Sequence, residues 1–146
     1  MKTFKKTLIE LHACKEAMIW IGNKDFKTFY DTCDIGDWLL WLYARTNKED
    51  LKGLTLAKAH CANTVRHLMT DKRSTDSIDV AILFGEGKAT LEQLKAAAAY
   101  YASASLAASE TSYSSAYSAY SAAQNQQLTA DICRKYLPIE NFNINF

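Results

Sequence analysis

The cysteines and histidines are the residues of this chain that could hold a metal ion or act as nucleophiles. None of the cysteines forms a C-x-x-C pair, and His60 and Cys61 are adjacent. Neighbouring positions of a helix point about 100° apart, so this pair cannot easily hold one metal ion. We predict no metal and no cofactor, whereas a Cys–His nucleophile assembled by the fold stays open. We expect all four cysteines to be reduced and to pack as small apolar side chains on helices: Cys14, Cys33, Cys61 and Cys133.

The segment FGEGKAT is similar to a phosphate-binding loop in its glycines and its lysine. A Walker A loop requires G-x-x-x-x-G-K-[ST], because consecutive backbone amides surround the phosphates and a hydroxyl binds the metal. The residue five positions before Gly87 is Ile82, and alanine follows Lys88, so both requirements fail. We predict that Gly85 and Gly87 end a helix instead. Since the sequence also contains no serine elbow and no Gly-rich oxyanion loop, we predict that the protein is not an enzyme.

Three aspartates recur at every third position around a predicted junction between two helices: Asp31, Asp34 and Asp37. Carboxylates at such positions commonly cap helices and interact favourably with the N-terminal dipole. The same three side chains could instead form an acidic surface that attracts a basic partner. Both interpretations follow from the spacing, and the second makes these residues candidate contacts for a protein partner.

Residues 96–123 consist almost entirely of alanine, serine and tyrosine. Alanine is the best helix former, and Tyr113, Tyr117 and Tyr120 fall on one helical face at i, i+4 and i+7. We predict a helix rather than a flexible linker, which normally contains glycine and lacks aromatic residues. The tyrosines are either half-buried packing residues or contacts for a partner, since tyrosine gives a large contact area for little loss of side-chain entropy.

The elements that must position these residues are all predicted to be helices. The chain contains one proline and five glycines among 146 residues, and runs of alternating Val, Ile and Thr are missing. Apolar residues recur at three- and four-residue steps, as on the buried face of a helix. We predict helices at 5–21, at 25–33, in DWLLWLYAR with Asp37 as N-cap, and at 50–68, 76–84 and 91–136, with residues 70–77 as a polar turn.

We predict a single all-α domain over residues 1–146, formed as a bundle of about five to six helices. Its parts are a body of short helices at 1–88, a long helix at 89–138 and a tail at 139–146. Thr90 followed by Gln93 is a capping-box pattern that starts the long helix, and a break near residues 109–111 stays open. The predicted structural core, centred on the tryptophan-containing helix, includes Trp20, Trp38, Trp41, Leu42 and Cys61.

Charge and hydropathy argue against two classes of partner. The formal net charge is +1, so no global field attracts nucleic acid. No run approaches the ~18 consecutive apolar residues of a membrane-spanning helix. Charged residues between positions 10 and 16 interrupt the apolar residues that follow the first lysines, so the N-terminus does not match a signal peptide. We therefore expect a cytoplasmic protein that binds neither nucleic acid nor a membrane.

Five motifs follow one another along the chain: A-C-x-E-A at 13–17 with Trp20, C-D-x-G-D-W-L-L-W-L at 33–42, H-x-x-x-D-x-R-S at 67–74, GEGKATLEQLKAAAAY at 85–100 and ADICRKYLP at 130–138. Together they resemble a family of small bacterial immunity proteins, and the resemblance covers nearly the whole chain. It implies a cytoplasmic antitoxin that binds a cognate toxin and blocks it.

Two functions follow as hypotheses. In the first, the protein binds a toxin stoichiometrically and covers its active site with a preformed helical surface, for which the three aspartates and three tyrosines are the candidate contacts. In the second, the protein has a structural or assembly role, for example in a phage. It would then form a homo-oligomer through the Ala/Ser-rich helix, where small side chains let two helices approach closely.

Overall fold

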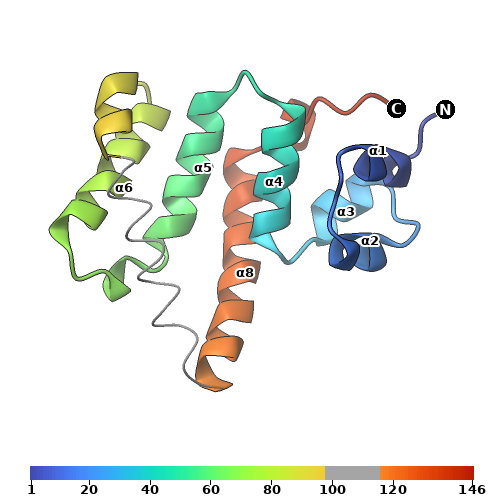
Figure 1. The fold of residues 1–146 in the computed structure, drawn as a ribbon, viewed down its shortest axis with the longest axis horizontal. Helices are drawn as coiled ribbons and strands as arrows, with labels where there is room; N and C mark the ends of the chain where they lie inside the picture. Colours follow the sequence, from blue (N-terminus) through green and yellow to red (C-terminus); the bar gives the residue numbers. More distant parts are fainter. Residues whose placement is uncertain (98–115) are drawn as a thin grey trace.

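The computed structural model describes residues 1–97 and 116–146, with the backbone alone at residues 116–123. Every regular element in these residues is a helix, so the prediction of an all-α fold is confirmed for this part of the chain (Figure 1). Residues 91–97 are helical as well. The α-helices are α1 (Phe4–Glu10), α2 (Lys15–Ile21), α3 (Phe26–Thr32), α4 (Gly36–Thr46), α5 (Leu51–Asn63), α6 (Lys72–Gly85) and α8 (Ala116–Tyr136), and 3₁₀ turns cover Arg66–Leu68 and Ile139–Asn141.

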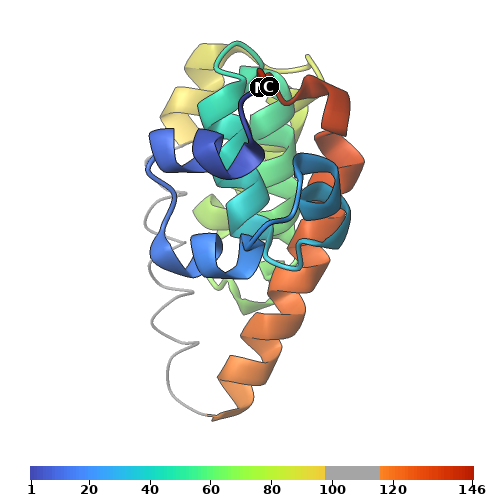
Figure 2. The same cartoon turned by 90° about the vertical axis from the view of Figure 1, so that its right-hand side faces the viewer.

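Helix α8 lies in the middle of the assembly and packs against both α4 and α5. Helix α6 packs on α5, while the short helices α1, α2 and α3 gather at the opposite end of the molecule (Figure 1). The N- and C-termini lie close together in both views, beside this group of short helices (Figure 2). Near them, Phe142 after the last 3₁₀ turn packs on Phe26 and Tyr30 of α3.

One buried cluster contains side chains of α1 to α5 and of α8, together with Leu137 and Phe142 beyond the end of α8. Removing apolar side chains from water in this way is the main force that holds the helices together. The tryptophans Trp20, Trp38 and Trp41 are half-buried and pack against this cluster rather than forming its centre. The largest fully buried side chains are Tyr43, Ile21, Leu39, Leu42, Ile78 and Leu137.

The predicted helix at 5–21 is wrong, because the chain turns between α1 and α2. His12 has φ +60, and its N–H donates to the carbonyl of Ile9. The N–H of Ala13 donates to the carbonyl of Leu8, which completes the Schellman arrangement that ends many helices. Glycine usually occupies the left-handed position of this motif, and here a histidine takes it. Cys14 becomes the exposed N-cap residue of α2, so it does not pack as an apolar side chain.

The predicted N-cap of α4 is also wrong by two positions. The helix begins at Gly36 with Ile35 as its N-cap residue, and Asp37 lies in the first turn. A carboxylate in the first turn still interacts favourably with the helix dipole. The carboxylate of Asp37 accepts a hydrogen bond from the side-chain amide of Gln126, as described below.

Two other boundaries differ from the prediction. Helix α5 ends at Asn63, and a 3₁₀ turn follows, so the helix predicted at 50–68 is shorter than expected. Helix α6 begins at Lys72 instead of residue 76, because the carboxylate of Asp71 accepts a hydrogen bond from the N–H of Arg73 and caps it. The polar residues of this segment are thus helical. An ion pair between Lys72 and Asp76 supports the first turns.

Other local signals are confirmed. Helix α3 contains the predicted apolar residues, and α6 ends at Gly85, followed by Gly87 at φ +77. The hydroxyl of Thr90 accepts from the N–H of Gln93, whose side chain accepts from the N–H of Thr90. The predicted end at residue 136 is also correct, since α8 stops two residues before Pro138. Whether one helix connects 91–97 with α8 lies outside the described residues, as does the break considered near 109–111.

Candidate protein-binding surface

The acidic junction, which we define as Asp31, Asp34 and Asp37, lies between α3 and α4, and all three residues are exposed. Asp31 forms an ion pair with Lys27 one helical turn earlier, and the carboxylate that caps α3 belongs to Asp25 instead. Within the described ranges, no ion pair holds Asp34. Asp34 is therefore the carboxylate of this group that is best placed to attract a cation of a partner.

Asp37 joins the acidic junction to α8 through a reciprocal pair of hydrogen bonds. The side-chain amide of Gln126 donates to the carboxylate of Asp37 at 2.9 Å, and its oxygen accepts from the N–H of Asp37 at 3.3 Å. The side chain of Gln126 thus satisfies one of the free amides at the N-terminus of α4. The contact sets the start of α4 beside the middle of α8.

Gly36 allows α4 and α8 to approach closely at the same point. A Cβ atom at this position would lie 2.2 Å from Oγ1 of Thr129, 2.7 Å from its Cβ and 2.8 Å from its carbonyl carbon. Real Cβ atoms do not come this near to other atoms, and backbone cannot move aside as a flexible side chain can. The absence of a side chain at Gly36 is therefore required for the observed contact.

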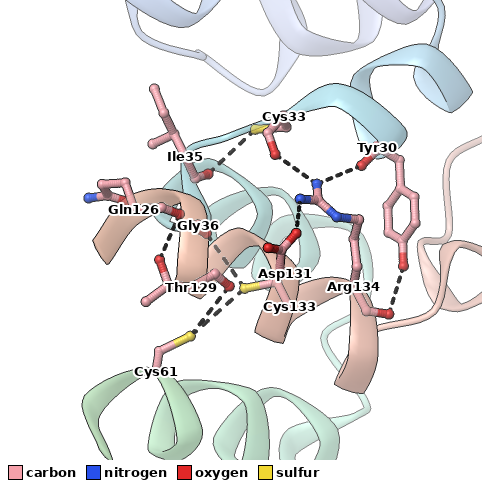
Figure 3. A network of polar contacts seen from close by, with 10 residues as sticks. All are labelled: Tyr30, Cys33, Ile35, Gly36, Cys61, Gln126, Thr129, Asp131, Cys133 and Arg134. Atoms are coloured by element: carbon pink, nitrogen blue, oxygen red, sulfur yellow. Dashed lines mark hydrogen bonds and ion pairs between the residues drawn. The ribbon is translucent and has the colours of Figure 1, made fainter. Parts of the chain in front are cut away.

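Arg134 connects α8 to the end of α3 (Figure 3). Its guanidinium donates to the carbonyls of Tyr30 at 3.0 Å and Cys33 at 2.7 Å, and it pairs with Asp131 at 2.7 Å. Burial raises the pKa of Tyr30, so its hydroxyl keeps its proton and donates to the carbonyls of Arg134 and Leu137. These bonds satisfy carbonyls at the C-terminal ends of both helices, which have no partner within their own helix.

Replacing Arg134 with glutamine should destabilise the protein by about 2 kcal/mol, because two carbonyls lose a charged donor at once. The stability of Arg134→Lys should fall between that of the wild type and that of Arg134→Gln, since a single ammonium cannot reproduce the planar donor geometry of the guanidinium. Chemical denaturation measures the difference. Lys135→Gln, which removes the same charge from the exposed neighbouring position, is the control and should change stability by less than about 0.5 kcal/mol. An Arg134→Gln variant as stable as this control would contradict the role given to Arg134.

Cys61 of α5 and Cys133 of α8 bring their sulfur atoms to 4.0 Å from each other (Figure 3). Cys133 is buried and Cys61 is half-buried. The contact between the two thiols lowers the pKa of Cys61, whereas the same contact and burial raise the pKa of Cys133. The spacing in the sequence shows no sign of this pair, since the two cysteines are 72 positions apart.

Of the three tyrosines predicted as contacts, the structure describes the backbone of two. Tyr117 and Tyr120 belong to the first turns of α8, which extend beyond the ends of α4 and α5 (Figure 1). Their side chains lie outside the description, and Tyr113 lies outside the described residues altogether. The same helix continues from these turns to Gln126, which contacts Asp37 of the acidic junction.

A cavity of about 280 Å³ lies where the turn between α1 and α2 faces α4. Its walls are mainly aliphatic and aromatic, which suits apolar contact better than acid–base chemistry. Sequence reasoning missed it, because the cavity exists only where the chain turns at His12. The side chains around it are Leu8, His12, Ala13, Cys14, Ala17, Ile21, Phe29, Asp37, Trp38, Trp41 and Leu42.

In the described ranges, no cluster of three or more His, Cys, Asp or Glu side chains could hold a metal ion. His60 stacks on Tyr136 with ring centroids 4.3 Å apart, and burial lowers its pKa. Its partner in this structure is thus an aromatic ring of α8. None of the helices described here is long and apolar enough to pass through a membrane.

No protein-family model matches this chain, and no curated protein or solved structure matches it significantly. The resemblance to bacterial immunity proteins therefore stays a prediction. What the protein does has to be inferred from the contacts described above.

Proposed function

We propose that this protein is a non-catalytic binding module that neutralises a toxin by covering its active site, as the resemblance to bacterial immunity proteins implies. The observation that carries the proposal is the contact between Asp37 and Gln126. It holds the acidic junction against α8 at a point six residues after Tyr120, or about 9 Å along the helix axis.

The packing of the surrounding helices supports such a role. Gly36, Cys133 and Arg134 hold α8 against α3, α4 and α5, so the part of the surface at the acidic junction is already formed before a partner arrives. A preformed surface loses less conformational entropy on binding than one that must fold first. The proposed place of action is the cytoplasm.

Charge supports a basic partner. Asp34 is exposed, and Asp31 and Asp37 lie three residues before it and three residues after it. A toxin whose active site attracts an anionic substrate would present lysine or arginine side chains to this junction. Complementary charge of this kind speeds association and rejects wrong partners.

The test is co-expression with the protein encoded by the neighbouring gene, followed by a growth assay and a binding measurement on the purified pair. We expect the wild type to relieve growth arrest. Asp34→Lys should weaken binding about tenfold, the effect of one poorly matched charge at an interface. Glu49→Lys makes the same change of charge at an exposed position beyond the other end of α4, and should bind as the wild type does.

Equal affinity for both charge-reversal variants would remove the acidic junction from the interface. The absence of any complex, together with a mass that rises with concentration in light scattering, would favour self-association through the Ala/Ser-rich helix. Relief of growth arrest at amounts far below those of the toxin would contradict a stoichiometric, non-catalytic mechanism.

A further inference from the structure

The two thiols at the contact between α5 and α8 are close neighbours from separate helices. The sulfur atoms of Cys61 and Cys133 are 4.0 Å apart, and both side chains point into the space between the helices (Figure 3). Cys33 is engaged elsewhere, since its thiol donates to the carbonyl of Ile35, and Cys14 is exposed at the start of α2. The fold therefore selects one pair out of four cysteines.

We propose that Cys61 and Cys133 form a reversible disulfide by exchange with a low-molecular-weight disulfide, with oxidised glutathione as the representative oxidant. This site is independent of the proposed toxin binding. It concerns only the packing of α5 on α8, which the described part of the structure contains.

The other contacts of the two sulfurs are weak enough to be given up. Cys61 lies 3.8 Å from the carbonyl of Thr129, and Cys133 lies 3.7 Å from the carbonyl of Gly36. Thiols are weak hydrogen-bond donors, so little is lost when both side chains turn towards each other. The sulfur atoms must approach by about 2 Å to reach the length of a disulfide, which side-chain rotation and a small shift of the helices can supply.

The environment of each thiol sets the order of the steps. Cys61 is the more exposed of the two, and its lowered pKa favours the thiolate that attacks. Its sulfur bonds to one sulfur of the oxidant, the S–S bond of the oxidant breaks, and a thiolate leaves. Cys133 then gives up its proton to solvent or to that thiolate and attacks Sγ of Cys61. The second thiolate leaves, and the two electrons of the protein thiols have passed to the oxidant as two reduced thiols.

The consequence is a covalent link between residues that are 72 positions apart. A crosslink restricts the unfolded chain more when it closes a longer loop. We therefore expect the oxidised protein to unfold at a higher temperature, with a Tm rise of roughly 5–10 °C. The link would also fasten the C-terminal part of α8 to α5, independently of the Arg134 contacts.

The experiment exposes the folded full chain to oxidised glutathione, digests it without reduction and identifies crosslinked peptides by mass spectrometry. We expect one peptide that joins Cys61 to Cys133, an intact mass lower by two hydrogens, and a higher Tm that returns to its first value after reduction. Cys14→Ser should give the same result, whereas Cys61→Ser should give neither the peptide nor the shift in Tm.

The wild-type measurement tests whether the Cys61–Cys133 disulfide forms, even if a substitution at the buried Cys133 prevents folding. A folded wild type that yields only a glutathione adduct on Cys61 would overturn the proposal. The same holds if Cys61 or Cys133 pairs with Cys14 or Cys33 in equal yield, or if the expected peptide forms only after denaturation.

Discussion

Replacing Gly36 by alanine is expected to destabilise the protein by about 3 kcal/mol, near the upper end of what overpacking a tight contact costs. The expected sign is unusual, because alanine in place of glycine normally stabilises a helix by roughly 0.5–1 kcal/mol. Here the new Cβ would lie 2.2 Å from Oγ1 of Thr129 and 2.8 Å from its carbonyl carbon. Helices α4 and α8 would have to separate to admit it.

Chemical denaturation of the single variants and of Gly36→Ala/Thr129→Ala tests the cause. Removing the hydroxyl relieves part of the clash, so the double variant should lose less stability than the two single variants together. The relief should be incomplete, because Cβ and the backbone of residue 129 remain at 2.7 and 2.8 Å. A Gly36→Ala protein that is more stable than the wild type would show that α4 and α8 do not pack as described.

Replacing Tyr43 by alanine is expected to be more harmful still, with a loss of roughly 4–5 kcal/mol. Tyr43 is fully buried in α4, and its ring packs edge-on against Phe142 with centroids 4.9 Å apart. The residues after the last 3₁₀ turn are thus held on the core by this ring. Alanine would leave a large cavity beside Phe142.

The hydroxyl of Tyr43 makes a separate contribution that Tyr43→Phe isolates. It donates to the carboxylate of Asp50 and accepts from the amide of Asn47, while burial and Asp50 raise its pKa and so keep it protonated. We expect Tyr43→Phe to lose about 1–2 kcal/mol, since a half-buried carboxylate then lacks one donor. If phenylalanine destabilised the protein as much as alanine, the ring contact with Phe142 would carry none of the stability assigned to it.

The parts of the fold that sequence reasoning predicted are those that depend on neighbouring residues. The capping pair of Thr90 and Gln93, the end of α6 at Gly85 and the end of α8 before Pro138 each follow from a few adjacent side chains. The turn at His12 was missed because histidine takes a backbone conformation that usually signals glycine. The start of α6 was missed because the polar residues after Asp71 were interpreted as a turn.

The contacts that define the candidate surface join residues far apart in the chain, and local patterns contain no information about them. Gly36 is required for the close approach of Thr129 of α8, and no residue near it in the sequence indicates this role. The aspartates were predicted as a group, but only the structure shows that Asp37 is held by Gln126. The sequence predicts residues 139–146 only as a tail, whereas Phe142 is part of the core.

The most direct test of the central claim, that α8 is an integral part of the body, is amide hydrogen exchange on the full chain. The claim predicts that amides of residues 128–136 exchange as slowly as those of residues 39–43 in α4, because both require global unfolding to open. Exchange at residues 128–136 as fast as in an unstructured peptide, while α4 stays protected, would contradict it.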